Sequence, residues 1–276
     1  MTEAVTDRVF RSVSQLKQYR QCGYQYWLAR FAKDEDGQRI WQRPAAWFPQ
    51  GTGVHEAVDW WEKTGRTGSL EEMQLVYTEA FDRAVSEYTE QAPNFDEWFG
   101  SGWRYPAVKD LPRRFDIGLE QVEKYFRYYT EKHPDEVLYR THDGQPFVEV
   151  GFELQLGEVW VRGYIDQVYW DPEGRVWRVR DVKTGKNPGD ETQLAVYAVV
   201  VNEEYGTAID SGDYWMARTG KPTLVYDLRA WPKSRIIDEF AELEEGVRAE
   251  RFEPNPSKEN CMFCPVQAAC DYAALS

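Results

Sequence analysis

The sequence predicts a mixed α/β protein in which an N-terminal helical part precedes a small sheet. Two observations favour this order. Apolar residues recur at helical spacing through the first half of the 276-residue chain, whereas from Pro146 onward their period changes to two. Capping and turn residues then divide the second half into three strands, a helix and further strands. This order is typical of a mixed α/β core and not of a helical bundle or a β-sandwich.

Composition limits the classes to which the protein can belong. The hydrophobic fraction of 42% is sufficient for a core, and no stretch approaches the roughly 20 apolar residues of a membrane span. Residues 1–10 lack the basic and apolar regions of a signal peptide, so we expect a cytoplasmic protein with no membrane partner. The net charge of −14 argues against a general nucleic-acid coat protein. A local basic groove is still compatible with it, because distant charges are screened.

The helical part is expected to occupy residues 1–135. Capping residues, a glycine pair and apolar periodicity place the starts of four helices at Ser12, Gly51, Ser69 and Asp110. We expect the first helix to run to Phe31 with Cys22 inside it. The second helix carries His55 in its first turn, after glycines that let the backbone approach a neighbour closely. Taken alone, a single cysteine or histidine in a helix is most often a structural residue.

Residues 146–232 are expected to form the α/β core. Its second and third strands make a hairpin within residues 161–186, where β-branched and aromatic residues flank an Asp-Pro-Glu-Gly turn. A helix follows the hairpin, and on it Gln193 and Tyr197 are four residues apart and project from one face. Such a pair is ordinary surface in most proteins, but here it lies close in sequence to the end of the hairpin.

Three charged residues lie near the ends of the hairpin strands. Asp181 and Lys183 form a D-x-K pattern and must share one face, because residues two apart in a strand point the same way. Asp166 belongs to a G-x-x-D pattern on the preceding strand, and the hairpin can bring it beside them. Two carboxylates and an ammonium group can hold a divalent cation and contact the same phosphate. The alternative is a solvated ion pair worth about 0–1 kcal/mol.

Residues 233–276 are expected to form a helix followed by a cysteine cluster. Cys261, Cys264 and Cys270 make a C-x2-C-x5-C run, and Cys22 is the fourth cysteine of the chain. Close cysteines in a cytoplasmic protein are metal ligands more often than disulfides. Zinc and an iron–sulfur cluster both fit four thiolates. The uneven spacing is less like a zinc ribbon with paired cysteine knuckles.

Together these segments resemble the RecB-like nucleases of the PD-(D/E)XK superfamily. The branch that they resemble carries a 4Fe–4S cluster and includes the CRISPR-associated exonuclease family and the nuclease domain of AddB. The resemblance covers most of the chain as a single nuclease domain, residues 1–276. It rests on motifs in family order at Ser12–Cys22, Gly51–His55, Gly163–Asp166, Asp181–Lys183, Gln193–Tyr197 and the three terminal cysteines. In one departure, Ile165 stands where the family has a proline.

The resemblance implies a restriction-endonuclease-like core and a metal-dependent DNA exonuclease. Such an enzyme hydrolyses phosphodiester bonds from free DNA ends, and we expect single-stranded or frayed ends. It implies that Mg2+ or Mn2+ is bound by His55, Asp166, Asp181 and the Val182 carbonyl group. Lys183 then orients or activates the attacking water, and the catalytic set is completed by Gln193 and Tyr197, which support the site and the DNA backbone.

The resemblance also implies a 4Fe–4S cluster that joins the two ends of the chain through its four cysteines. Recombination, repair or CRISPR-adaptation proteins are the partners that it suggests. Four further basic residues can contribute to a basic groove near Lys183, and the alternative is that several of them alternate to the solvated face of the strand: Arg175, Arg178, Arg180 and Lys186. The alternative function is a non-catalytic DNA-binding or adaptor subunit that retains the fold. A degenerate protein of that kind is expected to lack a catalytic residue, and all of them are present here.

Overall fold

The computed structural model describes residues 8–274. The expectation about a signal peptide rests on residues 1–10 and lies mostly outside this range. In the described part of the chain, no helix is both long enough and apolar enough to cross a membrane. The α-helices are α1 (Val13–Gln21), α2 (Gly23–Arg30), α3 (Phe48–Lys63), α4 (Leu70–Gln91), α5 (Ala107–Arg127), α6 (Glu191–Tyr205), α7 (Lys233–Arg248) and α8 (Lys258–Cys261). The strands are β1 (Phe10–Arg11), β2 (Val148–Leu156), β3 (Val159–Asp171), β4 (Val176–Lys183), β5 (Ser211–Met216), β6 (Lys221–Pro222) and β7 (Tyr226–Asp227).

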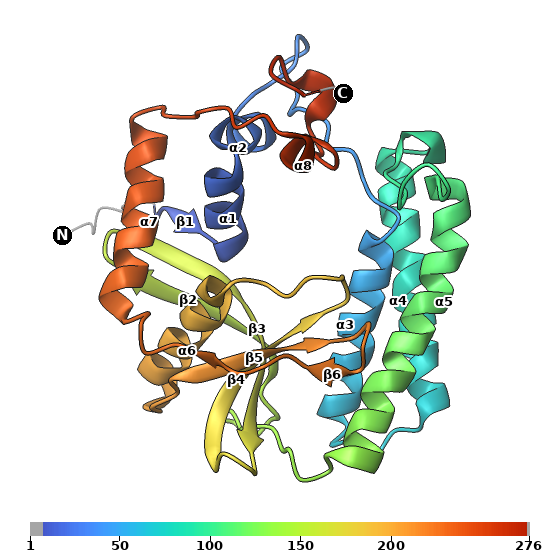
Figure 1. Cartoon of the computed structure of the whole chain (residues 1–276), viewed down its shortest axis with the longest axis vertical. Helices are drawn as coiled ribbons and strands as arrows, with labels where there is room; N and C mark the ends of the chain where they lie inside the picture. Colours follow the sequence, from blue (N-terminus) through green and yellow to red (C-terminus); the bar gives the residue numbers. More distant parts are fainter. Residues whose placement is uncertain (1–7, 275–276) are drawn as a thin grey trace, which may run out of the picture.

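A mixed sheet lies between two layers of helices, which confirms the mixed α/β prediction. Its strand order is β1-β3-β4-β5-β6, with β2 also paired to β3 and β7 to β5. The pairs β2–β3 and β3–β4 are antiparallel, whereas β4 and β5 are parallel and are connected through α6. In Figure 1 the helices α3, α4 and α5 stand on one side of the sheet, and α1, α6 and α7 stand on the other.

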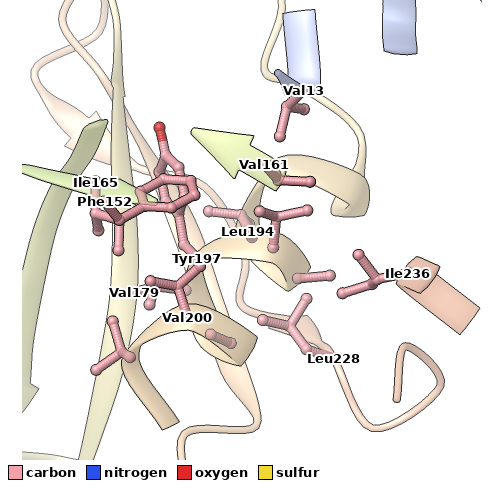
Figure 2. Close-up of a cluster of buried hydrophobic side chains, with 14 of the residues drawn as sticks. Val13, Phe152, Val161, Ile165, Val179, Leu194, Tyr197, Val200, Leu228 and Ile236 are labelled. Carbon is pink, nitrogen blue, oxygen red and sulfur yellow. The ribbon is translucent and has the colours of Figure 1, made fainter. Parts of the chain in front are cut away.

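The alternation of side chains along the strands divides the core into two clusters. On β5, Tyr214 and Met216 join the cluster under α6, whereas Trp215 joins the aromatic cluster of α3, α4 and α5. Figure 2 shows the first cluster, in which Leu194 and Val200 of α6 lie near apolar side chains of β2, β3 and β4. Because α6 is buried along most of its length, its side chains are held in fixed positions against the strands.

Side-chain amides join the helical layer to the end of β4. Gln50 of α3 donates to the Gln121 side chain of α5 at 2.6 Å. Gln121 in turn donates to the Thr184 carbonyl oxygen at 2.9 Å, directly after the strand. Arg114 donates to the Gln50 amide oxygen at 3.0 Å. These bonds, of which the one between Gln50 and Gln121 is fully buried, fix α3 relative to the strand that carries Asp181, since breaking a buried bond leaves an unsatisfied polar group.

Several helix boundaries differ from the sequence prediction. The helix expected to run unbroken to Phe31 ends at Gln21, because Cys22 adopts an extended backbone and its Sγ accepts from the Gln25 N–H at 3.4 Å. Helix α3 begins at Phe48, so His55 lies about two turns into the helix and not in its first turn. Helix α5 begins at Ala107, before Asp110. Ser12 and Ser69 are confirmed as helix caps. A full capping box was expected at both, but only Ser69 and Glu72 form one; Gln15 donates its backbone N–H to Ser12, and its side-chain oxygen has no hydrogen-bond partner among the described residues.

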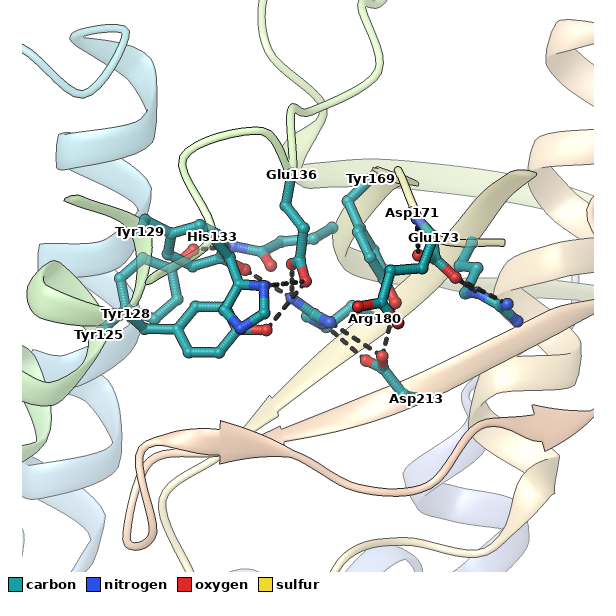
Figure 3. Close-up of polar contacts among 12 residues, drawn as sticks. Tyr125, Tyr128, Tyr129, His133, Glu136, Tyr169, Asp171, Glu173, Arg180 and Asp213 are labelled. Atoms are coloured by element: carbon teal, nitrogen blue, oxygen red, sulfur yellow. Dashed lines mark hydrogen bonds and ion pairs between the residues drawn. The ribbon is translucent and has the colours of Figure 1, made fainter. Parts of the chain in front are cut away.

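Arg180 is not part of a basic groove, and that expectation is wrong. Its side chain is buried between the sheet and the segment after α5 that carries Tyr129 and Glu136, with a relative exposure of 1%. Its guanidinium donates to both Asp213 carboxylate oxygens at 2.6 and 2.9 Å and to Glu136 at 2.7 Å (Figure 3). Arg178 is similarly engaged, in an ion pair with Asp171. Of the four basic residues, Arg175 and Lys186 are the exposed ones.

Replacement of Arg180 by leucine is expected to affect folding and not DNA binding. The free energy of unfolding should fall by about 3–5 kcal/mol, because Asp213 and Glu136 then remain buried without their cation. Chemical denaturation measures this change. Lys186→Leu, at an exposed position, should change stability by less than about 0.5 kcal/mol. An Arg180→Leu protein with unchanged stability and weakened DNA binding would contradict the assignment.

Candidate active site

The strand register places three carboxylates in a row across β2, β3 and β4. Gln167 of β3 pairs with Arg180 of β4, and the two strands are antiparallel. Asp166, which precedes Gln167, therefore stands opposite Asp181, which follows Arg180. On the other side of β3, Val148 pairs with Gln167 and Val150 with Ile165, which puts Glu149 opposite Asp166. Directly opposed residues of neighbouring strands project from the same face. The row therefore concentrates three negative groups at one place on the sheet.

His55 reaches this row from α3. Its Nδ1 lies 2.8 Å from Glu149 Oε1 and 3.7 Å from Asp166 Oδ2. One ligand atom from each of these residues lies within 4.8 Å of the others. Burial lowers the pKa of His55, but the charges of Asp166 and Glu149 outweigh burial and raise that pKa to about 9. The imidazole is therefore a cation at neutral pH in the metal-free protein.

Asp181 is almost completely buried and faces Lys183. Its Oδ2 lies 2.6 Å from Lys183 Nζ, as expected for residues that share a face of β4. Burial and the neighbouring Asp166 charge raise the pKa of Asp181 to about 6. Burial also raises the pKa of Asp166, although Asp166 Oδ2 accepts a hydrogen bond from the Val182 N–H at 2.8 Å. Both shifts show that negative charge at this place is costly even beside Lys183 and His55.

Gln193 and Tyr197 are part of this cluster and not ordinary surface. The Gln193 amide oxygen accepts from Lys183 Nζ at 3.2 Å, and its amide nitrogen donates to the Tyr197 hydroxyl at 2.9 Å. That hydroxyl lies 3.4 Å from a carboxylate oxygen of both Asp166 and Asp181. The hydrogen bonds thus connect the ammonium group of Lys183 to the two aspartates through α6.

Glu149 is the residue that sequence reasoning missed. It lies within a segment that was correctly expected to be a strand, but nothing in that segment marks one glutamate as special. The feature that identifies Glu149 is its position opposite Asp166, which is known only once the pairing of β2 with β3 is known. Its backbone is also unusual, with φ at +48° in the left-handed region that residues other than glycine rarely adopt. Such strained positions cluster at functional sites.

The donor atoms of the row fit a hard divalent cation. Carboxylate oxygens and an imidazole nitrogen are ligands that such cations accept. Among the described residues, Asp181 Oδ2 is buried and has no well-oriented hydrogen-bond donor, despite its ion pair with Lys183. It therefore has a lone pair available for a cation. The Val182 carbonyl remains a predicted ligand, since the contact seen at this residue is made by its N–H group.

The four cysteines lie at the junction of the two chain ends. Figure 1 shows α8 and the C-terminal segment beside α2. All four thiols are free, and those of Cys261 and Cys264 are buried. Burial raises the pKa of Cys264 to about 11, with contributions from nearby Cys270, Cys22 and Cys261. The fold thus brings Cys22 close to three cysteines that lie more than two hundred residues further along the sequence.

Comparison with known proteins agrees with this geometry. Residues 11–271 match the family model of the PD-(D/E)XK nuclease superfamily. The chain therefore belongs to this superfamily, and membership implies a metal-dependent nuclease with DNA as its substrate.

Two phage proteins are similar to the chain over nearly their whole length. The Gene 69 protein of Mycobacterium phage D29 is 43% identical over 268 residues, which cover 94% of this chain and 96% of that protein. The Gene 69 protein of Mycobacterium phage L5 is 39% identical over 295 residues, covering 98% and 99%. Neither name specifies a substrate or a mode of cleavage.

The affinity of the site for Mn2+ is expected to rise with pH between about 6 and 9. A bound cation must displace the His55 proton, whose pKa is about 9, and prefers ionised Asp181, whose pKa is about 6. Above the pKa of Asp181, one proton is released for each cation bound, so the affinity should rise by about tenfold per pH unit. The affinity should level off above the pKa of His55. Calorimetric titration in buffers of different ionisation enthalpy measures both the Mn2+ affinity and the number of protons released on binding. An affinity that is constant over this range would contradict the proposed ligands.

Proposed function

We propose that this protein is a RecB-like, metal-dependent DNA exonuclease that hydrolyses DNA from free ends, preferentially single-stranded or frayed ones. The observation that carries the proposal is the convergence of His55, three carboxylates and Lys183 on one place of the sheet. The preference for ends is supported by the motif order, which resembles that of RecB-like exonucleases. An adaptor without catalytic function has no need for this arrangement. The two core clusters share one sheet, which supports a single nuclease domain.

The metal ligands that we propose are His55, Asp166, Asp181 and the Val182 carbonyl, joined by Glu149. Glu149 also holds the His55 ring in place through its contact with Nδ1. When bound, Mg2+ or Mn2+ supplies Lewis acidity toward the phosphoryl oxygens and increases the acidity of coordinated water. The protein contributes carboxylates whose positions follow from the strand register and an imidazole that is supplied by α3.

Lys183 is proposed to neutralise charge that develops on the phosphoryl group and to orient the attacking water. Its ammonium group is held between Asp181 and the Gln193 amide oxygen, so it is positioned before DNA arrives. Gln193 and Tyr197 hold the lysine and the aspartates in their relative positions. The Tyr197 hydroxyl keeps its proton, because burial and the two aspartate charges raise its pKa well above the ordinary value.

The exonuclease proposal is tested with linear and covalently closed circular single-stranded DNA of the same sequence. With Mn2+, the protein should degrade the linear DNA and leave the circle intact, and EDTA should stop degradation. Labels at either end of the linear substrate report the polarity. Equal cleavage of both substrates would contradict the requirement for an end, while leaving the nuclease activity established.

Asp181→Ala is expected to abolish DNA hydrolysis without unfolding the protein. Removal of one opposed carboxylate relieves repulsion in the metal-free row, so the free energy of unfolding should stay the same or increase. Single-turnover assays and chemical denaturation measure the two effects. Asp238→Ala, at an exposed position of α7, is the matched control and should remain active. Wild-type turnover by a purified Asp181→Ala protein would disprove the assignment.

We further propose that Cys22, Cys261, Cys264 and Cys270 hold a 4Fe–4S cluster that stabilises the fold. The Cys22 sulfur accepts backbone N–H bonds from Gln25 and Asn255, each at 3.4 Å, and such bonds stabilise thiolates that bind a cluster. A structural role is favoured because hydrolysis of a phosphodiester needs no electron transfer.

The chain ends are also joined by contacts that do not involve sulfur. Tyr24 N–H donates to the Glu253 carbonyl oxygen at 3.3 Å, and the Asn255 side chain donates to the Gln21 carbonyl oxygen at 2.9 Å. A Cβ atom at Gly23 would lie 2.9 Å from the Glu253 backbone nitrogen, so the two backbones approach too closely for a side chain there. The junction is therefore shaped for close contact around the four thiols.

Anaerobically purified protein is expected to be brown, with iron and sulfide in about equal amounts. Cys22→Ala should lose the colour, become protease-sensitive at both ends and lose activity, because the cluster closes nearly the whole chain into a loop. Gly23→Ala should also lower the iron content, whereas Gly185→Ala, which has no atom within 4 Å of the new Cβ, should not. Colourless, active protein with stoichiometric zinc would contradict the cluster. Full stability and unchanged metal content in Cys22→Ala would contradict the role of Cys22.

A further inference from the structure

A second lysine reaches the proposed active site from α1. Lys17 Nζ lies 3.5 Å from the Gln193 amide oxygen, which also accepts from Lys183 at 3.2 Å. Because both lysines contact the same oxygen atom, their ammonium groups lie close to each other. Both side chains are partly accessible to solvent, at 31% for Lys17 and 28% for Lys183.

A shared neutral acceptor does not neutralise two cations. Lys183 has the buried Asp181 carboxylate as its counter-ion, at 2.6 Å. Lys17 has Asp190 at 3.3 Å, but the Asp190 side chain is 57% exposed. An exposed pair of this kind contributes about 0–1 kcal/mol. Because Lys183 is matched by a buried carboxylate and Lys17 only by a solvent-exposed one, Lys17 is the ammonium group that is left available to an anion.

The pairing with Asp190 does not by itself explain Lys17. Asp190 is the N-cap of α6, and its carboxylate already accepts from the Thr192 N–H at 3.1 Å. This capping role is complete without a lysine. If Lys17 had only a structural role, it would add an ion pair to a cap of α6 that is already complete.

Helix α1 is fixed in place by contacts at its other end. Tyr19 donates its hydroxyl to the Arg251 carbonyl oxygen at 2.7 Å, and the Gln21 carbonyl accepts from Asn255. The same helix ends at Gln21, and Cys22 is its C-cap. The junction of the chain ends therefore sets the position of Lys17 beside Gln193.

Building on the proposed exonuclease function, we propose that Lys17 binds a backbone phosphate of the DNA strand, next to the phosphate that Lys183 contacts. An ammonium group recognises phosphate as a point charge and without regard to sequence. Lys17 is thus a substrate-binding residue, whereas Lys183 acts on the bond that breaks. Loss of Lys17 should weaken DNA binding and raise KM, with a small effect on kcat.

The test measures binding of a short labelled single-stranded oligonucleotide to the full chain in EDTA, where no hydrolysis occurs, over a series of salt concentrations. Lys17→Met should weaken binding several-fold and reduce the slope of log K against log salt by about 0.7, the value for one phosphate contact on a single strand. Lys17→Arg should restore the slope, because it keeps the charge.

Two controls separate this role from a structural one. Asp190→Ser keeps a helix cap but removes the ion pair, and Lys132→Met removes a distant exposed charge. Both should retain the wild-type slope. A wild-type slope in Lys17→Met, or an equal loss in Asp190→Ser, overturns the proposal for Lys17 even if the wild-type protein cleaves DNA. A wild-type protein that neither binds nor cleaves DNA contradicts the proposed function itself.

Discussion

Repulsion among three carboxylates that face one another across adjacent strands is the constraint on which the site depends. Opposed like charges destabilise a sheet. Here Glu149 on β2 faces Asp166 on β3, which in turn faces Asp181 on β4. The raised pKa of Asp181, about 6, reflects burial together with the neighbouring Asp166. The fold offsets this cost with His55 and Lys183, which are brought from α3 and β4 to opposite sides of the row. The divalent cation that we propose among the carboxylates would offset this cost more fully.

The rest of the molecule holds these charges in place. The amide chain from Gln50 to Thr184 ties α3 to the end of β4, and buried α6 sets the position of Tyr197. On the opposite side of the sheet, Arg180 neutralises a second buried acidic group without any access to DNA. Positive charge in this acidic protein thus serves as an internal counter-ion at Arg180, whereas at Lys183 and Lys17 we propose that it contacts phosphate.

Much of this arrangement could be predicted from the sequence. The two-residue period placed Asp181 and Lys183 on one face, and capping residues located α4 and α6 correctly. Glu149 could not be found, because its role depends on the strand register and not on its own surroundings in sequence. Arg180 was misassigned because a strand alternates between two faces, and the sequence did not reveal that both faces are covered by helices. The break at Cys22 was missed because a thiol is an unusual helix cap.

The claim that the carboxylate row binds a divalent cation is tested most directly by anomalous X-ray scattering from crystals grown with Mn2+. The account predicts a manganese peak within coordination distance of His55, Asp166 and Asp181, with a Glu149 oxygen also in its coordination sphere. The peak should be lost in Asp181→Ala crystals. Crystals of active protein with fully occupied manganese elsewhere, and none at the row, would contradict the account.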